Sequence, residues 1–140
     1  MVLATADEGG RPWASPVYYA NAGYTDFYWV SSPEATHSRN IAARPQVSIV
    51  IFDSQVPIGT GQGVYMEAVA GSVEGPDLER GNEVFSARSL ESGGPAWTAD
   101  DVRAEGGLRL FRAAASAHSI LAKGGRPDHR IAVDVGDSEA

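Results

Sequence analysis

The segment Asp26–Phe52, DFYWVSSPEATHSRNIAARPQVSIVIF, contains two strand-like runs separated by a short polar stretch. Its first six residues are rich in aromatic side chains, which suit a pleated, half-buried strand. Its last six residues have almost no polar interruption and predict a central strand. Between the two runs we expect a short helix at His37–Ala43, because Pro33 suits the first turn of a helix and Pro45 drives the residue before it out of helical angles.

Further strand-like runs on both sides of this segment extend the same pattern. The first three runs are separated by turn sequences at Asp7–Gly10 and Asn21–Gly23 and predict a three-stranded meander. Gly71 is a candidate for a β-bulge, and Pro76–Leu90 is predicted to be a second helix with an incomplete apolar stripe. The predicted strands are Met1–Ala6, Pro12–Ala20, Asp26–Ser31, Val47–Phe52, Gly63–Glu74, Leu108–Leu121 and Ile131–Val135.

These elements form one mainly β domain over residues 1–140. Six or seven mostly antiparallel strands with two short helices favour a small closed barrel over a parallel α/β sheet. A chain of 140 residues buries about 68% of the surface that its unfolded form exposes, so it can build a core without disulfides or metals. The chain has no cysteine, which excludes thiol nucleophiles, zinc fingers and disulfide scaffolds.

The net negative charge indicates which classes of partner the protein can bind. Eleven basic residues stand against eighteen acidic ones, for a net charge of −7, and the arginines are scattered. A nucleic acid would need a basic stripe, so it is not expected as a partner. No apolar run approaches the roughly 20 residues of a membrane span, and we expect a cytoplasmic protein.

Several familiar motifs are not supported by the residues around them. Gly59-Thr60-Gly61-Gln62-Gly63 resembles part of a dinucleotide fingerprint, but Val64 follows it and the segment leads into a strand rather than a helix. The three histidines, His37, His118 and His129, lack the close spacing that places two ligands on one helical face, so no metal site is expected. No side chain is assigned a catalytic role.

The strongest local signal for a binding site lies at the start of the predicted helix. Ser31 and Ser32 end a strand, and Thr36-His37-Ser38-Arg39 begins the helix. Hydroxyl donors, a guanidinium and the free N–H groups of a helix start can gather around one anion. The segment therefore predicts a phosphate pocket, with helix capping and solvation as the alternative interpretation.

The order of these motifs resembles that of a known family. The quoted sequence runs Gly10-Arg11-Pro12-x-x-Ser15-Pro16-Val17, then Trp29-Val30-Ser31-Ser32-Pro33, then His37-Ser38-Arg39-Asn40-Ile41-x-x-x-Pro45, then Gly61-x-Gly63-Val64-x-x-Glu67. Over about residues 1–75 this is similar to the pyridoxamine 5′-phosphate oxidase-like, FMN-binding split-barrel proteins. The oxidases themselves carry an arginine–lysine pair where this chain has Thr36-His37, so the resemblance points to the family rather than to pyridoxamine-phosphate oxidation itself.

The resemblance implies a homodimer of split β-barrels with an FMN site in each of two clefts between the subunits. It implies three groups of cofactor-binding residues: Ser15, Pro16 and Val17 along the flavin ring; Val30, Ser31 and Ser32 beside its edge and ribityl chain; and His37, Ser38 and Arg39 at the phosphate. Gln62 is a further candidate for a ring contact. The implied activity is an FMN-dependent oxidoreduction of a small molecule that the sequence does not identify.

Two alternatives keep the same fold. One is a deazaflavin-dependent reductase, because some branches of the family prefer that related coenzyme. The other is a non-catalytic carrier or sensor that binds flavin or haem, in which His37, His118 or His129 would be the haem ligand. A structural dimerisation module without a ligand is a third, less specific interpretation.

Overall fold

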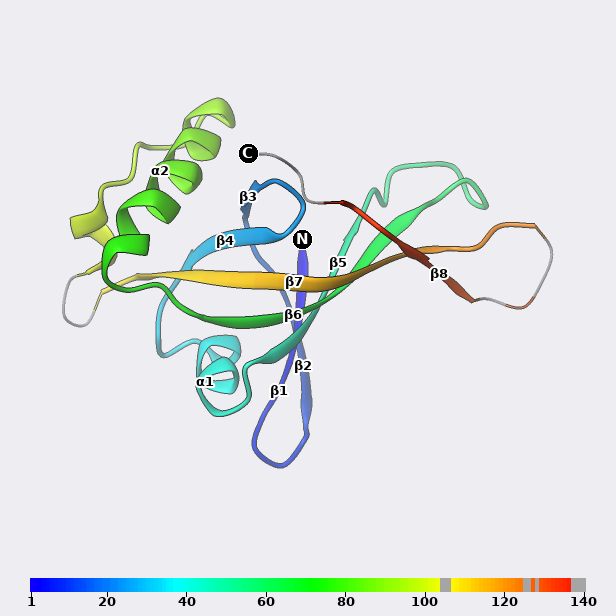
Figure 1. Ribbon diagram of the computed structural model, residues 1–140, viewed down its shortest axis with the longest axis horizontal. Coiled ribbons are helices and arrows are strands. Elements are labelled where there is room, and N and C mark those ends of the chain that lie inside the picture. The colour runs from blue at the N-terminus through cyan, green and yellow to red at the C-terminus, as the bar shows by residue number, and fades with distance from the viewer. Residues whose placement is uncertain (104–106, 125–126, 128, 137–140) are drawn as a thin grey trace.

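The computed structural model describes residues 1–103, 107–124, 127 and 129–136 (Figure 1). Four strands precede the first helix, two more strands lead to the second helix, and the last two strands follow it. The elements are β1 (Val2–Ala6), β2 (Pro12–Pro16), β3 (Ala20–Ala22), β4 (Asp26–Ser31), α1 (Thr36–Ala43), β5 (Gln46–Phe52), β6 (Gly63–Ser72), α2 (Pro76–Glu91), a 3₁₀ turn η1 (Ala99–Val102), β7 (Arg109–Leu121) and β8 (Arg130–Val133).

The strands form one antiparallel sheet in the order β2-β1-β5-β6-β7-β4-β3, with β8 also paired to β7. The predicted strand Pro12–Ala20 is therefore wrong, and the described residues form eight strands rather than the six or seven predicted. The chain changes partner within residues 17–19, because β2 pairs with β1 whereas β3 pairs with β4. The predicted three-stranded meander is wrong for the same reason: β2 and β3 lie at opposite ends of the strand order. Proline at both ends of β2 fits the position of this strand at the edge of the sheet.

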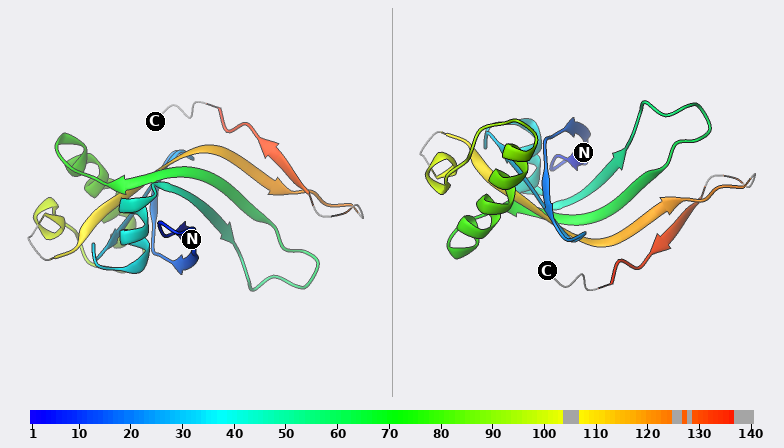
Figure 2. Two further views of the ribbon diagram at one scale, coloured as in Figure 1. Left: turned by 90° about the horizontal axis from the view of Figure 1, so that it is seen from below. Right: turned by 90° about the horizontal axis from the view of Figure 1, so that it is seen from above.

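The long strand β7 joins the two parts of the sheet. Its first half pairs with β4, from Arg109 to Ala114, and its second half pairs with β8, from His118 to Leu121. The register between β6 and β7 shifts between Glu67 and Ala68, so the bulge lies there and not at the predicted Gly71. The sheet curves strongly when it is seen edge-on, and the β5–β6 hairpin and the β7–β8 pair project away from the end that carries α2 (Figure 2). This open, curled sheet is the split barrel that the resemblance implies.

Two apolar clusters pack on opposite faces of β4, because successive side chains of a strand point to opposite sides. Trp29 belongs to the cluster closed by α1 and stacks on Phe111, with ring centroids 5.6 Å apart. Its neighbour Tyr28 belongs to the cluster beneath α2. Gly81 of α2 lies so close to the sheet that a Cβ atom there would sit 2.7 Å from Tyr28 Cε1.

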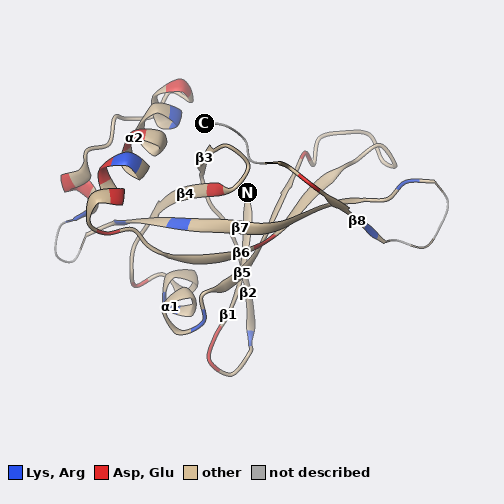
Figure 3. Ribbon diagram, viewed as in Figure 1, with Lys and Arg blue, Asp and Glu red and all other residues tan. Residues whose placement is uncertain are grey.

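Both predicted helices are present, at nearly the predicted ends. Charged residues are concentrated on α2 and in the turns, and within the described residues Lys and Arg form no continuous stripe (Figure 3). The described part of the chain holds no helix that is long and apolar enough to span a membrane.

Candidate functional site

The junction between β4 and α1 holds a linked set of polar side chains. Ser31, the last residue of β4, places its Oγ 2.8 Å from His37 Nε2 in the first turn of α1. The Ser32 hydroxyl accepts the N–H of Glu34 at 3.1 Å, and the Glu34 carboxylate pairs with the guanidinium of Arg39. Hydroxyl, imidazole and guanidinium groups therefore meet within nine residues of chain.

The start of α1 lacks the side-chain cap that helices often use. Its N-cap residue is Ala35, no side chain bonds the first N–H groups, and the first turn contains no acidic residue. These N–H groups carry the positive end of the helix dipole, which favours an anion. The junction thus combines uncapped donors with the Ser31 and His37 side chains, a set of groups that can bind an anion.

Burial favours the neutral form of the His37 imidazole. Partial burial lowers its pKa below the ordinary value of 6.5. A dianionic phosphate beside the ring would favour the charged form and counteract this effect. Protonation of His37 is therefore expected to be linked to anion binding at the junction.

Ser38 takes a different position from its neighbours in the sequence. The residue is 3% exposed, and its Oγ has no hydrogen-bond partner within the described part of the chain. It lines a cavity of about 490 Å³ between α1, the end of β6 and the start of β7, which also includes Ser72 and Phe111. Ser38 does not share the environment of His37, although the two residues are adjacent.

Asn40, which the sequence did not single out, is also buried and donates to Thr5 Oγ1 at 3.0 Å, tying α1 to β1.

The predicted ring-binding residues of β2 lie on the edge of the sheet beside α1. Trp13 Nε1 donates to Ser15 Oγ at 3.0 Å, and Pro16 is exposed. The N–H of Val17 bonds the carbonyl of Met1 at 3.0 Å. The strand therefore ends in a fixed backbone position, from which the Val17 side chain turns toward a second and larger cavity.

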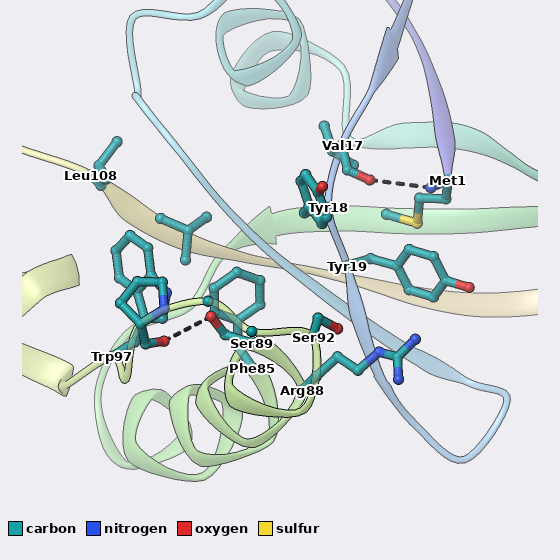
Figure 4. A pocket seen from close by; sticks show the side chains of 14 residues that line it. Met1, Val17, Tyr18, Tyr19, Phe85, Arg88, Ser89, Ser92, Trp97 and Leu108 are labelled. Carbon is teal, nitrogen blue, oxygen red and sulfur yellow. Dashed lines mark hydrogen bonds between the residues drawn. The ribbon is translucent and has the colours of Figure 1, made fainter.

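That larger cavity has a volume of about 850 Å³ and lies between α2, the segment after it and the β2–β3 connection (Figure 4). Val17 and Val30, predicted from two different strands, both line it. The other named lining residues are mostly aromatic or small: Met1, Tyr18, Tyr19, Phe85, Arg88, Ser89, Ser92, Gly93, Gly94, Pro95, Trp97 and Leu108. Arg88 is the one charged side chain among these residues, and its ion pair with Glu91 is long, at 3.5 Å.

Sequence reasoning missed the contribution of α2 to this cavity. Phe85, Arg88 and Trp97 are more than 50 residues from Val30 in the chain, and the only local signal was the incomplete apolar stripe of α2. The fold brings them together because α2 packs against β3, β4 and β7.

Gln62 is not brought to the junction within one chain. It precedes β6 at the projecting end of the sheet, where its Nε2 donates to the carbonyl of Leu121 and its Oε1 accepts the N–H of the same residue, each at 3.2 Å. In this position Gln62 holds the ends of β6 and β7 together.

The histidines are separate from one another. His118 Nε2 lies 2.6 Å from the carbonyl oxygen of Tyr24, and the side chain is buried. His129 is exposed, with Nδ1 3.0 Å from the carbonyl oxygen of Pro127. Together with the Ser31–His37 bond, these contacts occupy one ring nitrogen of each histidine.

The curled antiparallel sheet, closed by α1 and carrying a polar junction at the end of β4, defines a small split-barrel domain. The chain belongs to the pyridoxamine 5′-phosphate oxidase family, whose model matches residues 1–126. A search of curated proteins finds no match.

Solved structures with the same fold include haem proteins. The haem storage protein HutZ from Vibrio cholerae is 27% identical, with a TM-score of 0.63, and the match covers 82% of this chain and 80% of HutZ. A haem-binding protein from Mycobacterium smegmatis is 22% identical, with a TM-score of 0.71 over 94% of this chain; the chain spans 51% of that protein. A candidate pyridoxamine 5′-phosphate oxidase from Listeria innocua is 15% identical, with a TM-score of 0.61 over 85% of each chain.

Proposed function

We propose that the protein binds FMN along the path from the large cavity to the start of α1 and acts as a flavin-dependent oxidoreductase on a small molecule. The observation that carries this proposal is the polar junction at the end of β4, where Ser31 Oγ lies 2.8 Å from His37 Nε2 beside the uncapped N–H groups of α1. Val17, which lines the large cavity, packs against the same apolar cluster as Ile41 of α1. A cofactor with a ring at one end and a phosphate at the other would use both the apolar wall and the anion-binding helix start.

The residues present fit this cofactor. The uncapped N–H groups of α1, together with Ser31 and His37, would hold the phosphate, and Arg39 would add charge once its pairing with Glu34 loosens. Val17 and Val30 would exclude water from the ring. FMN supplies the redox chemistry when it is bound, while the protein contributes binding, orientation and hydrogen bonds that adjust the ring. The remaining volume of the cavity, beside Arg88, would take a substrate with an anionic group.

The site is proposed to form between two copies of the chain. Gln62, implied as a ring contact, lies at the projecting end of the sheet, and the nearby loop exposes apolar side chains such as Ile58. A second copy would bring its Gln62 toward the junction of the first. This arrangement explains how one residue of the predicted set can lie far from the others within a chain.

The first test is an absorbance spectrum of the purified protein after incubation with FMN and desalting. Retained flavin bands, with quenching of the flavin fluorescence, support the proposal, and complete loss of added FMN contradicts it. Ser31→Ala should lower FMN retention, whereas Ser116→Ala, which removes an exposed hydroxyl on β7, should not. If the protein binds the deazaflavin coenzyme more tightly than FMN, the proposed binding residues stand and the deazaflavin coenzyme is the cofactor.

Haem binding is a second candidate, favoured by the 27% identity to HutZ, a haem storage protein. His129 is exposed and its Nε2 makes no hydrogen bond among the described residues, so it would be the most accessible ligand. His37 and His118 would first have to give up their bonds to Ser31 and to the carbonyl of Tyr24. Titration with haemin distinguishes the two functions: a Soret band that His129→Ala removes would favour haem, whereas its absence together with FMN retention would exclude this candidate.

A further inference from the structure

We propose that Trp97 determines the substrate specificity of the large cavity and that Asn82 is its positioning residue, so that the cavity selects ligands with a flat aromatic ring. This inference rests on the proposed function for the statement that the ligand is a substrate. It assigns a role to the segment between α2 and η1, which the cofactor does not use.

Trp97 forms a wall of the cavity and is half-buried there. Its ring meets Phe85 of α2 edge to face, with centroids 5.8 Å apart and an interplanar angle of 68°. In Figure 4 the Trp97 and Phe85 rings lie at one end of the cavity, and Tyr19 lies at the other. Aromatic pairs of this kind contribute energy beyond the burial of their area, and a third ring entering the cavity can gain a similar contact.

The backbone of Trp97 is held on both sides by α2. Asn82 Nδ2 donates to the carbonyl of Trp97 at 2.8 Å, and the N–H of Trp97 donates to Ser86 Oγ, also at 2.8 Å. Asn82 and Ser86 are four residues apart, so they lie on one face of the helix. One turn further on, Ser89 Oγ donates to the carbonyl of Pro95 at 2.7 Å. Three side chains of one helical face thus bind the segment that carries Trp97.

Burying the Asn82 amide lowers the stability of the fold unless the amide has a further role. The residue is 5% exposed, and its Oδ1 has no hydrogen-bond partner among the described residues. A buried polar atom without a partner is unfavourable, and an apolar residue of similar volume would avoid that cost. Within the described part of the chain, the side-chain bond that Asn82 makes is to the carbonyl of Trp97, so we infer that positioning Trp97 is what this amide does.

The support beneath the wall is rigid. Gly81, next to Asn82, lets α2 approach Tyr28 so closely that no side chain fits between them. After Trp97, Thr98 and Asp101 form a reciprocal capping box at the start of η1, with the Asp101 carboxylate accepting both the N–H and the hydroxyl of Thr98 at 2.7 Å. The backbone that carries the ring is therefore held by hydrogen bonds before any ligand arrives, which reduces the entropy cost of binding a planar molecule.

The test uses 1-anilinonaphthalene-8-sulfonate, an aromatic anion whose fluorescence reports binding, and decanoate, an aliphatic anion measured by calorimetry. Trp97→Leu should weaken binding of the aromatic probe about fivefold, as expected when one aromatic contact is lost, and should leave decanoate affinity nearly unchanged. Trp13→Leu is the matched control, because Trp13 is 48% exposed on β2 and does not line the cavity. Equal affinities for the aromatic probe in Trp97→Leu and the unmodified chain overturn the proposal.

The positioning role is tested by Asn82→Leu and Ser86→Ala, with Ser86→Thr as the variant that keeps the acceptor. Asn82→Leu and Ser86→Ala should each weaken binding of the aromatic probe as Trp97→Leu does. In a Trp13→Phe background, both variants should also make Trp97 more accessible to acrylamide quenching. Ser86→Thr should keep the probe affinity and the quenching of the unmodified chain. Melting temperatures close to that of the unmodified chain exclude unfolding as the cause. Unchanged quenching in both removal variants contradicts the role of Asn82.

FMN retention, measured on the same variants, separates the two proposals. Loss of aromatic selectivity in a protein that retains no FMN would overturn the proposed function and leave the role of Trp97 standing. Full FMN retention with no effect of Trp97→Leu on the aromatic probe would support the proposed function and overturn the role of Trp97.

Discussion

At the scale of single residues, the candidate cofactor site depends on how each side chain is already engaged. Arg39 offers a guanidinium to a phosphate, but Glu34 pairs with it, and both side chains are largely exposed. His37 offers a ring nitrogen, but that nitrogen contacts Ser31. Anion binding at this junction therefore exchanges existing contacts for new ones, and variants of the existing partners should change the affinity in opposite directions.

The pair Arg39 and Glu34 gives the first prediction. Arg39→Ala should weaken FMN binding by about 1.5–3 kcal/mol, the scale of a charge-assisted hydrogen bond. Glu34→Gln should strengthen FMN binding, because it frees the guanidinium and removes a negative charge near the phosphate. Dissociation constants from flavin fluorescence titrations measure both changes. Equal constants in all three proteins would refute the assignment of Arg39.

The second prediction concerns the pH dependence contributed by His37. Because burial lowers the pKa of His37 in the folded protein, the unfolded chain binds a proton at this residue more readily. The free energy of unfolding should therefore fall as the pH drops below 6.5, the ordinary value, and should not depend on this group well above it. Urea denaturation of the apo protein between about pH 5 and pH 8 should show a smaller acid loss in His37→Gln. A steeper loss in the variant would show that the ring is stabilised in its charged form.

At the scale of elements, the sequence predicts what depends on local pattern. The run from β4 through α1 to β5 is predicted within a few residues, because proline before the helix and at its end, together with apolar strands on both sides, are local signals. The sequence does not predict the break between β2 and β3, because no turn sequence marks it. The strand ends there because the chain leaves β1 and pairs with β4 instead. Val17 and Val30 were placed on the candidate site through the resemblance, whereas Phe85 and Trp97 were not, since only packing of α2 on the sheet brings them there.

That packing gives the third prediction. A Cβ atom at Gly81 would lie 2.7 Å from Tyr28 Cε1 and 3.0 Å from Leu110 Cδ2. Gly81→Ala should therefore destabilise the protein by about 1–2 kcal/mol, because the overpacking cost exceeds the gain in helix propensity. Gly71→Ala is the control, since a Cβ atom there meets nothing within 4 Å. Urea midpoints measure both effects, and a Gly81→Ala protein as stable as the unmodified chain would show that α2 can move away from the sheet.

At the scale of the whole molecule, the β5–β6 loop at the projecting end of the sheet is tied to β7 by hydrogen bonds and exposes apolar side chains. Gln62 and Lys123 tie the β5–β6 loop to β7, through the backbone of Leu121 and the carbonyl of Thr60. On this end Phe52 is 56% exposed, and Ile58 is fully exposed. A fixed apolar surface of this kind is typical of an interface, and a second copy of the chain is the partner that the proposed site requires.

The fourth prediction follows from that surface. Ile58→Asp should raise the dimer dissociation constant about thirtyfold, as for the loss of a hot spot worth about 2 kcal/mol, and should lower FMN retention in parallel because the proposed site draws on both copies. Leu90→Asp, at a 56% exposed leucine on α2 at the other end of the molecule, should leave the dimer intact. Light scattering on a size-exclusion column, over a range of protein concentrations, measures the mass. A monomeric unmodified protein that retains FMN would show that the site is complete within one chain, and an Ile58→Asp protein that remains dimeric would show that this loop is not part of the interface.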